Sequence, residues 1–265
     1  MPFQQFDSIR YFNFNSLRDE GVVHAVFSRQ GGVSPDPWAA LNVGGTVGDR
    51  TERVAENKLR AMKAIGRSID SIYDVWQVHS SDVVIAEYPR LSNQPPVKAD
   101  AILTDRVGVN LFMRFADCVP ILLYEPVKKV VGIVHAGWQG TVNRTVRSAI
   151  QAMQDEFRVK ANDIMAAIGP SIGAHHYEIG FDLVAKVQHV FGSDSTGLLG
   201  NYQGKSKGSG IQLDLWEANR LILEQSGVRQ IEFSGICTAC HLEDWYSYRG
   251  EAGHTGRFGV MIGLK

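Results

Sequence analysis

Two apolar runs near the middle of the chain constrain the fold more than any other feature. Val119–Tyr124 and Val130–Val134 are both rich in Val, Ile and Leu, residues that are enriched in strands. The polar segment Glu125–Lys128 separates the two runs and contains a proline. This strand–turn–strand pattern predicts an antiparallel hairpin.

The register of this hairpin decides which side chains meet. If Tyr124 pairs with Lys129, Cys118 falls opposite His135, and directly opposed residues have Cβ atoms about 4.5–5.5 Å apart. We assume this register, which brings a thiol and an imidazole within reach of each other or of one metal ion. A slip of one residue would put the two side chains on opposite faces.

Further elements are expected from alternation, glycines and prolines along the chain. Strands are expected at residues 21–28, 73–79, 82–87, 99–104, 109–112, 163–168 and 230–233, and in the C-terminal tail. Helices are expected at residues 49–65, 181–191 and 214–226, and also after Thr141, a suitable N-cap. The many glycines of residues 198–210 predict a flexible surface loop. Because we find no internal repeat and no linker, we expect residues 1–265 to form a single domain.

The composition is that of an ordinary globular chain and argues against several functional classes. The 265 residues are 44% hydrophobic and 21% charged, with a formal net charge of −1. Such a charge favours neither nucleic acid nor a membrane surface as a partner. We find no signal-peptide pattern and no apolar run of membrane-spanning length. Three cysteines argue against a disulfide framework, so we expect a cytoplasmic protein.

Three potential metal ligands lie near the ends of predicted strands. A catalytic zinc site uses three protein ligands and leaves a fourth position open. His79, Cys118 and His135 supply suitable nitrogen and sulfur donors, although their spacings of 39 and 17 residues match no local metal motif. Two alternatives stay open. One is a nucleophilic pair of Cys118 thiolate and His135 imidazolium, and the other is a buried cysteine with two hydrogen-bonded histidines.

A second cysteine motif, CTAC, contains Cys237 and Cys240 and is followed directly by His241. A C-x-x-C-H string can attach a haem or form half of a zinc site. We find no export signal, which haem attachment requires, and no second half-site of matching spacing. A structural zinc or a redox pair therefore stays an open alternative here. His175 and His176 lie in a predicted loop, from which His176 could approach a metal.

Two arginines near the C-terminus are candidates for binding a phosphate or a carboxylate. Arg249 lies in WYSYRG and Arg257 in TGRFG. Guanidinium groups bind such anions in a bidentate manner. Salt bridges to Glu243, Asp244 or Glu251 would explain either arginine equally well.

Seven segments of this chain, taken together and in order, resemble a known family. It is the YfiH/YlmD/LACC1 family, also called the laccase-domain or multicopper polyphenol oxidoreductase family. The resemblance covers nearly the whole chain and rests on SRQGGVS at 28–34, LNVGGTVGD at 41–49, QVHS at 77–80, ADCVPILLY at 116–124, VHAGWQGT at 134–141, IGPSIG at 168–173 and YSYRG…TGRFG at 246–259.

The resemblance implies a fold, a metal and an activity. The implied fold is α+β, a layered α/β sandwich with mixed sheets (CNF1/YfiH-like), shared with a toxin deamidase that uses Cys and His. The implied metal is zinc on His79, Cys118 and His135. The implied activity is a cytoplasmic purine nucleoside phosphorylase acting on adenosine, inosine, guanosine and methylthioadenosine, with adenosine deaminase activity. Laccase-like phenol oxidation and correction of peptidoglycan precursors are also attributed to members.

The chain departs from the family pattern at several positions. Phe115 replaces a usual threonine, Ser171, His175 and His176 stand where cysteines are common, and Gly250 takes the place of a second arginine. These changes leave the three metal ligands intact. Multicopper oxidases need many histidines in clustered motifs, and the eight histidines here form no such motif. We therefore rank laccase activity, and copper as its cofactor, below zinc.

Three hypotheses follow for the function. The first is a zinc enzyme acting on purine nucleosides and phosphate, in which Arg29, Arg249 and Arg257 bind phosphate and Asn42 and Gln77 contact the sugar or base. The second is a metal-free hydrolase or amidase with a cysteine nucleophile and a histidine base. The third is a binding module in which zinc only fastens strand ends. The expected partners are a small-molecule purine nucleoside and phosphate, with neither nucleic acid nor a membrane, and the sequence sets no oligomeric state.

Overall fold

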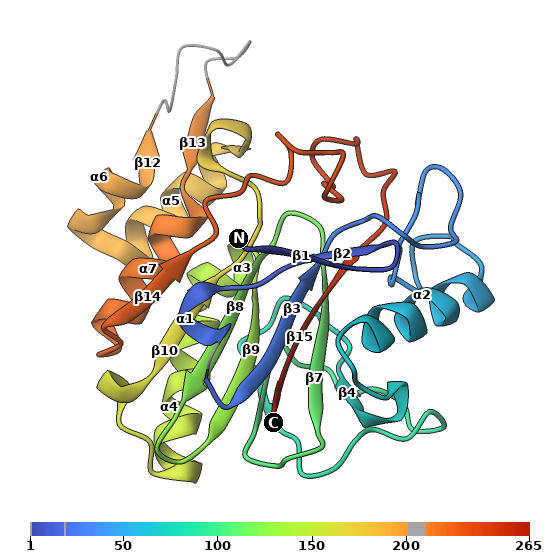
Figure 1. Ribbon diagram of the computed structural model, residues 1–265. Coiled ribbons are helices and arrows are strands. Elements are labelled where there is room, and N and C mark those ends of the chain that lie inside the picture. Colours follow the sequence, from blue (N-terminus) through green and yellow to red (C-terminus); the bar gives the residue numbers. More distant parts are fainter. Residues whose placement is uncertain (1, 19, 201–209) are drawn as a thin grey trace.

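Two six-stranded sheets packed face to face form the centre of the molecule (Figure 1). The computed structural model describes residues 2–18, 20–200 and 210–265. In spatial order the first sheet consists of β1 (Phe3–Phe6), β2 (Ile9–Phe12), β3 (Val22–Phe27), β15 (Phe258–Leu264), β7 (Asn110–Phe115) and β4 (Ile72–Asp74). The second consists of β14 (Gln230–Phe233), β10 (Met165–Ile168), β8 (Val119–Glu125), β9 (Val130–Ala136), β6 (Ala101–Thr104) and β5 (Val83–Ile85).

Both large sheets are mixed. The pairs β4–β7, β5–β6 and β10–β14 are parallel, and the other neighbouring pairs are antiparallel. A small third sheet contains β11 (Glu178–Ile179), β13 (Ile211–Leu213) and β12 (Leu199–Gly200). The helices are α1 (Asn15–Arg18), α2 (Thr51–Ala64), α3 (Trp138–Val142), α4 (Thr145–Phe157), α5 (Phe181–Phe191), α6 (Ser195–Leu198) and α7 (Leu215–Gln225).

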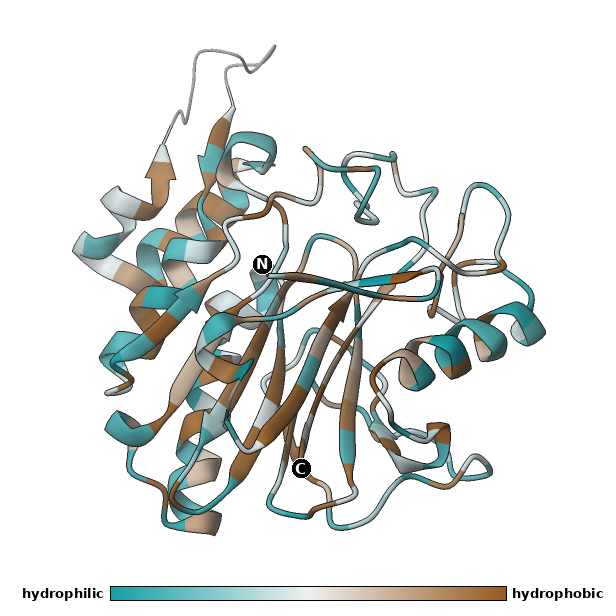
Figure 2. Ribbon diagram, in the orientation of Figure 1, coloured by the Kyte–Doolittle hydropathy of each residue, from teal (hydrophilic) through white to brown (hydrophobic). Residues whose placement is uncertain are grey.

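Three apolar clusters separate these elements into layers. Between the sheets, Leu111 and Ile262 of the first sheet pack in one cluster with Ile133 of the second. On the outer face of the first sheet, Met62 of α2 belongs to a cluster with Phe112. The outer face of the second sheet is covered by α4 and α7. Figure 2 shows that hydrophobic residues are concentrated on the central strands. The predicted layered sandwich with mixed sheets is therefore confirmed.

The hairpin forms as predicted, but its assumed register is wrong by two residues. Tyr124 pairs with Val131 and not with Lys129, and His135 pairs with Pro120 and not with Cys118. A shift of two residues preserves the face on which each side chain lies, because side chains alternate along a strand. The two side chains therefore stay on the face between the sheets, where Cys118 packs against the inter-sheet core.

The register differs because the four-residue connection lies one residue later in the chain than assumed, at 126–129 and not at 125–128. The side chain of Glu125 accepts hydrogen bonds from the backbone N–H groups of Val127 and Lys128, at 3.2 and 2.5 Å. Lys129 takes a left-handed conformation with φ 56°, so β9 begins only at Val130. These local hydrogen bonds stabilise a four-residue connection.

Most of the other predicted elements are present, with two clear exceptions. The expected strand at 73–79 ends at Asp74. The helix expected after Thr141 is two helices, α3 and α4, because Arg144 is left-handed with φ 57°, so Thr141 is no N-cap. Of the expected loop at 198–210, residues 201–209 lie outside the described residues. No helix in the described ranges is both long and apolar enough to cross a membrane.

Candidate metal centre and adjoining cavity

A cavity of about 760 Å³ opens beside the ends of β4, β7 and β9 and the start of β8. The C-terminal segment 234–257, orange-red in Figure 1, crosses above the start of β15 at the same end of the molecule. The cavity is lined by Gly44, Gly45, Thr46, Lys58, Asp74, Trp76, Gln77, His79, Arg90, Pro96, Arg114, Ala116, Asp117, Cys118, His135, Trp138, Tyr177, Tyr248, Arg249 and Arg257. It contains the predicted metal ligands together with several basic and aromatic side chains.

The structure brings His79, Cys118 and His135 together on the wall of this cavity. Cys118 Sγ lies 3.8 Å from His79 Nε2. The two imidazole rings meet edge to face with centroids 4.9 Å apart. His135 is buried, Cys118 is half-buried and His79 is exposed, so the three donors are graded from the protein core to the open cavity.

A buried carboxylate orients His135. Asp100 Oδ1 lies 2.8 Å from His135 Nδ1, which leaves Nε2 as the ring nitrogen available on the cavity side. The other oxygen, Asp100 Oδ2, accepts the N–H groups of Val78 and Ser80 at 3.1 and 2.6 Å. Asp100 thereby fixes the loop on either side of His79, which has a left-handed φ of 61°. One carboxylate positions two of the three predicted ligands, and the sequence patterns do not single it out.

The donor set fits a zinc ion. Each of the three residues offers one ligand atom, and these atoms lie within 4.8 Å of one another. Zinc binds histidine nitrogen and cysteine sulfur at about 2.0–2.3 Å, so one ion can bridge such a set. Zinc-binding histidines commonly donate their other ring N–H to a carboxylate, as His135 does to Asp100. Three protein ligands beside a cavity are typical of a catalytic site, which keeps an open position.

The same arrangement favours a thiolate at Cys118. Burial would raise the pKa of Cys118, but the charge of His135 and hydrogen bonds from both imidazoles lower this pKa to about 6. Burial would lower the pKa of His135, but the Cys118 thiolate and the Asp100 carboxylate raise that pKa to about 9. A thiolate is the form of cysteine that binds metals and attacks electrophiles.

Replacing Gly137 with alanine is expected to weaken metal binding by about ten-fold or more, the loss typical when the support of a metal ligand is disturbed. A Cβ atom at this position would lie 2.7 Å from Cys118 Sγ and 3.2 Å from His79 Cδ2. Gly137 has φ −72°, so alanine fits the backbone and acts only through this contact. Zinc titration against a competing chelator measures the change, with Gly45→Ala as control, because no atom lies within 4 Å of that Cβ. Equal affinities would contradict the geometry.

Asp117 connects the metal ligands to the C-terminal segment. Its Oδ1 accepts hydrogen bonds from Thr238 and Ser247, both at 2.7 Å, and its Oδ2 accepts the backbone N–H of Arg249 at 2.6 Å. Asp117 precedes Cys118 and has a left-handed φ of 82°. Such strained residues persist where surrounding contacts determine them and often lie at functional sites.

Arg249 and Arg257 line the cavity without a carboxylate partner. Arg249 Nη1 donates to the carbonyl of Glu178 at 3.0 Å, and Arg257 Nη1 donates to the carbonyls of Thr255 and Gly256. Neither arginine forms a salt bridge within the described ranges. The alternative partners are used elsewhere: Asp244 binds Arg10, Glu251 binds Arg29 and Glu243 contacts His241. Both guanidinium groups are therefore available to an anion in the cavity.

Arg29 and Asn42, which we expected at the site, do not line the cavity. Arg29 donates from Nε to the carbonyl of Ala39 and from Nη1 to the carbonyl of Leu242, and Nη1 pairs with Glu251 at 2.9 Å, so this guanidinium is engaged within the protein. Asn42 is fully buried, and its carboxamide oxygen accepts the N–H of Arg257 at 2.9 Å. Both residues therefore support the loops around the site.

Gln77 lines the cavity, but its carboxamide is largely used by the neighbouring strand. Gln77 Nε2 donates to the carbonyl of Arg114 at 2.8 Å, and Gln77 Oε1 accepts the N–H of Arg114 at 3.0 Å. These two hydrogen bonds extend the pairing between the segment after β4 and strand β7. Gln77 therefore shapes the cavity wall.

Three further basic side chains surround Asp74 on the cavity wall, and no sequence pattern groups them together. Arg90 pairs with this carboxylate at 2.5 Å, Arg114 at 3.4 Å and Lys58 at 3.9 Å. Burial and the nearby Arg114 lower the pKa of Lys58. Lys58 lies on the helix expected at 49–65 and Arg114 follows the strand expected at 109–112, so each looks like an ordinary surface charge in sequence. Only the fold reveals that they converge on one carboxylate.

Aromatic rings complete the cavity wall. Trp76, Trp138, Tyr177 and Tyr248 line it, and Trp76 and Tyr248 are 47% and 56% exposed. Large exposed aromatic rings in a concave site offer stacking faces for a planar ligand. The cavity thus combines a metal donor set, unpaired guanidinium groups and aromatic faces.

The chain is similar in sequence to proteins named purine nucleoside phosphorylase. A purine nucleoside phosphorylase of Deinococcus radiodurans is 38% identical over 243 residues, covering 92% of this chain and 89% of that protein. The purine nucleoside phosphorylase YlmD of Bacillus subtilis is 34% identical over 252 residues, covering 92% and 89%.

Solved structures show the same fold. YlmD from Geobacillus stearothermophilus superposes with a TM-score of 0.87 at 30% identity, covering 100% of this chain and 99% of that one. The hypothetical protein YfiH of Bacillus licheniformis superposes with a TM-score of 0.89 at 29% identity, with the same coverage. The sequence model described as multi-copper polyphenol oxidoreductase laccase matches residues 23–265. The chain therefore belongs to the laccase-domain family of YfiH and YlmD.

Proposed function

We propose that this protein is a zinc-dependent purine nucleoside phosphorylase. The observation that carries the proposal is a single cavity holding His79, Cys118 and His135 together with Arg249 and Arg257. The names of the relatives from Deinococcus radiodurans and Bacillus subtilis support the reaction class. The free state of all three cysteines supports a reducing compartment, the cytoplasm.

In this proposal His79, Cys118 and His135 would hold the ion. When bound, zinc supplies a Lewis acid and a means of lowering the pKa of a water molecule toward neutrality. Asp100 keeps the Nδ1 proton on His135 and so presents its Nε2 to the cavity. Asp117 holds the Cys118 backbone and the Arg249 backbone in one arrangement through its own hydrogen bonds.

The remaining residues bind the two substrates. The aromatic rings, such as Trp76 and Tyr248, stack on the purine, and Arg249 and Arg257 bind phosphate through charge-assisted hydrogen bonds. A phosphate oxygen forms a bond to ribose C1′ while the C1′–N9 bond breaks and the purine leaves with the electron pair. The proposed nucleosides are adenosine, inosine, guanosine and methylthioadenosine. Deamination of adenosine, in which water adds at C6 and ammonia leaves, is proposed for the same cavity.

Replacing Arg249 with methionine is expected to raise the KM for phosphate by about ten- to a hundred-fold, because a hydrogen bond to a charged group contributes about 1.5–3 kcal/mol. Steady-state phosphorolysis of inosine at varied phosphate measures the change. Zinc content should not change, because Arg249 binds no metal in this scheme.

Two matched variants locate the phosphate. Arg229→Met removes an exposed arginine that does not line the cavity and should leave the KM unchanged. Lys58→Met weakens the basic group around Asp74. If Lys58→Met raised the KM for phosphate and Arg249→Met did not, phosphate would bind to the basic side chains around Asp74 and not to Arg249. If inosine were never cleaved in the presence of phosphate, the phosphorylase proposal itself would fail.

A second candidate function rests on one specific observation. Cys118, His135 and Asp100 form a series of thiol, imidazole and carboxylate, with the His135–Asp100 contact at 2.8 Å. This is the arrangement of a cysteine hydrolase and would suit an amidase acting on peptidoglycan precursors. Such an enzyme should resist chelators and lose activity when iodoacetamide alkylates Cys118. Loss of activity on chelation, with recovery on adding zinc, would rule it out.

A further inference from the structure

We propose that a second zinc site, separate from the cavity, is formed by His175, His176, Cys237 and Cys240. Each residue offers one ligand atom, and the four atoms lie within 4.8 Å of one another. None of the four lines the cavity described above. The sequence contains no second half-site of spacing that matches the cysteine motif, and the fold supplies a half-site as two adjacent histidines.

The four side chains converge from two distant segments. His175 Nε2 lies 3.0 Å from Cys240 Sγ, and the rings of His175 and His176 meet edge to face with centroids 4.7 Å apart. Cys237 is buried, whereas Cys240 and His176 are exposed. An ion bound here would be reachable from solvent on one side and anchored to the protein on the other.

Backbone hydrogen bonds hold the cysteine half of the site. Residues 236–238 pair with Ser171, because Ser171 N–H donates to the carbonyl of Ile236 at 3.2 Å and Thr238 N–H donates to the carbonyl of Ser171 at 3.0 Å. Cys240 N–H donates to the carbonyl of Cys237 at 3.2 Å and closes a turn. The two thiols are thereby fixed on one side of a tight loop.

Gly173 joins the two halves. Its backbone N–H donates to Cys237 Sγ at 3.2 Å, a contact that stabilises negative charge on sulfur. A Cβ atom at Gly173 would lie 2.7 Å from His175 Cε1 and 3.3 Å from Cys237 Cβ. The loop thus passes so close to both ligands that only glycine fits without displacing them.

The donor set determines which metal this site would take. Two thiolates and two imidazoles at C-x-x-C spacing match closed, four-coordinate structural zinc sites. The cavity site offers only three protein ligands. The second ion would therefore bind without a free position and would act as a structural metal.

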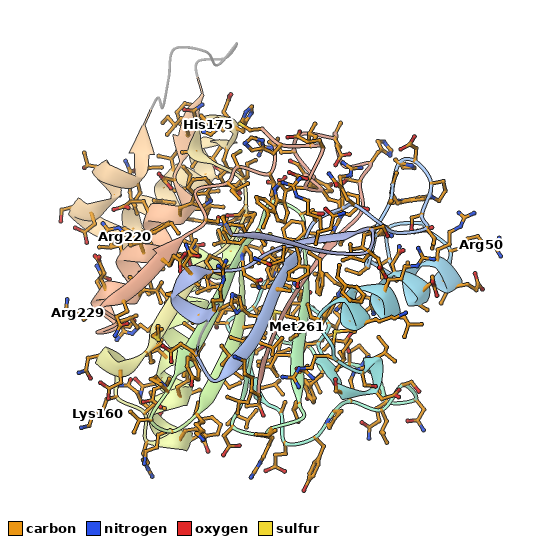
Figure 3. The ribbon with its side chains drawn as sticks, viewed as in Figure 1. Arg50, Lys160, His175, Arg220, Arg229 and Met261 are labelled. Atoms are coloured by element: carbon orange, nitrogen blue, oxygen red, sulfur yellow. The ribbon has the colours of Figure 1, made fainter. Side chains whose placement is uncertain are left out.

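The position of the site indicates what the metal would hold. Figure 3 shows His175 at the upper end of the molecule beside β13, and Gln212 of β13 donates to the His175 carbonyl at 3.2 Å. The histidine-bearing loop continues to Tyr177, and the cysteine-bearing segment continues to Arg249. Arg249 lies 5.2 Å above the Tyr177 ring in the cavity wall. The second ion would thus fasten together the two segments that form this wall.

Zinc content per chain tests the proposal. After purification under reducing conditions and saturation with zinc, followed by desalting, we expect about two zinc ions in the wild type. We expect about one in Cys118→Ala and about one in the double variant Cys237→Ser, Cys240→Ser. One zinc in the wild type that persists in the double variant would overturn the second site. One zinc lost only in the double variant would instead overturn the cavity site.

Further variants keep the test decisive if the double variant does not fold. His176→Ala removes an exposed ligand and should release the second zinc to a chelator at least ten-fold more readily. His241→Ala is the matched control, because His241 adjoins Cys240 but lies outside the ligand set, and it should retain both ions. Cobalt substitution of Cys118→Ala should give the ligand-field and thiolate charge-transfer bands of a tetrahedral site. Absence of these bands, or a Cys237–Cys240 disulfide under reducing conditions, would overturn the proposal.

Discussion

Replacing Cys118 with alanine is expected to abolish phosphorolysis of inosine and to remove the zinc of the cavity site. Cys118 is the sulfur donor of the set and lies 3.8 Å from His79 Nε2. Changes to groups that only support a ligand reduce metal affinity or activity by about 10–100-fold, so losing the ligand itself should have a larger effect. Activity assays and elemental analysis of the same preparation measure both consequences.

Two further measurements make this result interpretable. The alanine variant should unfold cooperatively and keep the far-ultraviolet circular dichroism of the wild type, because Cys118 is only half-buried. Asp100→Asn should show an intermediate loss, because it weakens the orientation of His135 but keeps all three ligand atoms. Wild-type turnover by Cys118→Ala would remove both the zinc mechanism and the cysteine hydrolase alternative.

Acidification from pH 7 to pH 4 is expected to cost about 3 kcal/mol of folding free energy at His24 alone. Burial lowers the pKa of His24 to about 4 from its usual value of 6.5, more than the nearby Glu232 raises it. A shift of one pKa unit corresponds to about 1.4 kcal/mol. His24 is 4% exposed, and its Nε2 accepts the N–H of Phe14 at 2.8 Å, which requires the neutral ring.

The direction of the effect follows from proton binding. Between pH 4 and pH 6.5 the unfolded chain binds the His24 proton and the folded chain does not, so stability falls as pH falls. The contribution is complete above pH 6.5 and is lost progressively down to pH 4. Denaturant unfolding of the wild type and of His24→Gln at several pH values isolates the contribution of His24 to stability. The Gln carboxamide can accept the Phe14 N–H without titrating. Parallel pH profiles for the two proteins would contradict the assignment.

The fold can be predicted from sequence where local pattern and tertiary packing agree. Helices α2, α5 and α7 have one apolar face each and match their expected ranges within about two residues. Strands β8 and β9 are buried on both faces, so they appear as continuous apolar runs. The position of the hairpin turn is less predictable, because Glu125 still pairs with Val130 and its side chain stabilises a connection that begins one residue later than the apolar pattern implies.

The metal ligands can be inferred from sequence, but their support cannot. Asp100 reaches His135 because β6 pairs with β9, with Ala101 opposite Val134, and this pairing is invisible in a local pattern. Arg29 looks equivalent to Arg249 in sequence, yet only Arg249 lines the cavity. A guanidinium that is paired with a carboxylate, as in Arg29, and one that lines a cavity without such a partner, as in Arg249, differ only in their tertiary contacts.

The distribution of charge inside the cavity has a consequence for how the protein meets its ligands. Five basic side chains line the cavity but only two acidic ones, Asp74 and Asp117, although the whole chain carries a formal net charge of −1. A concave surface with low-dielectric walls focuses such a local field and raises the nearby concentration of counter-ions. The protein can therefore gather anions at one point while staying nearly neutral overall.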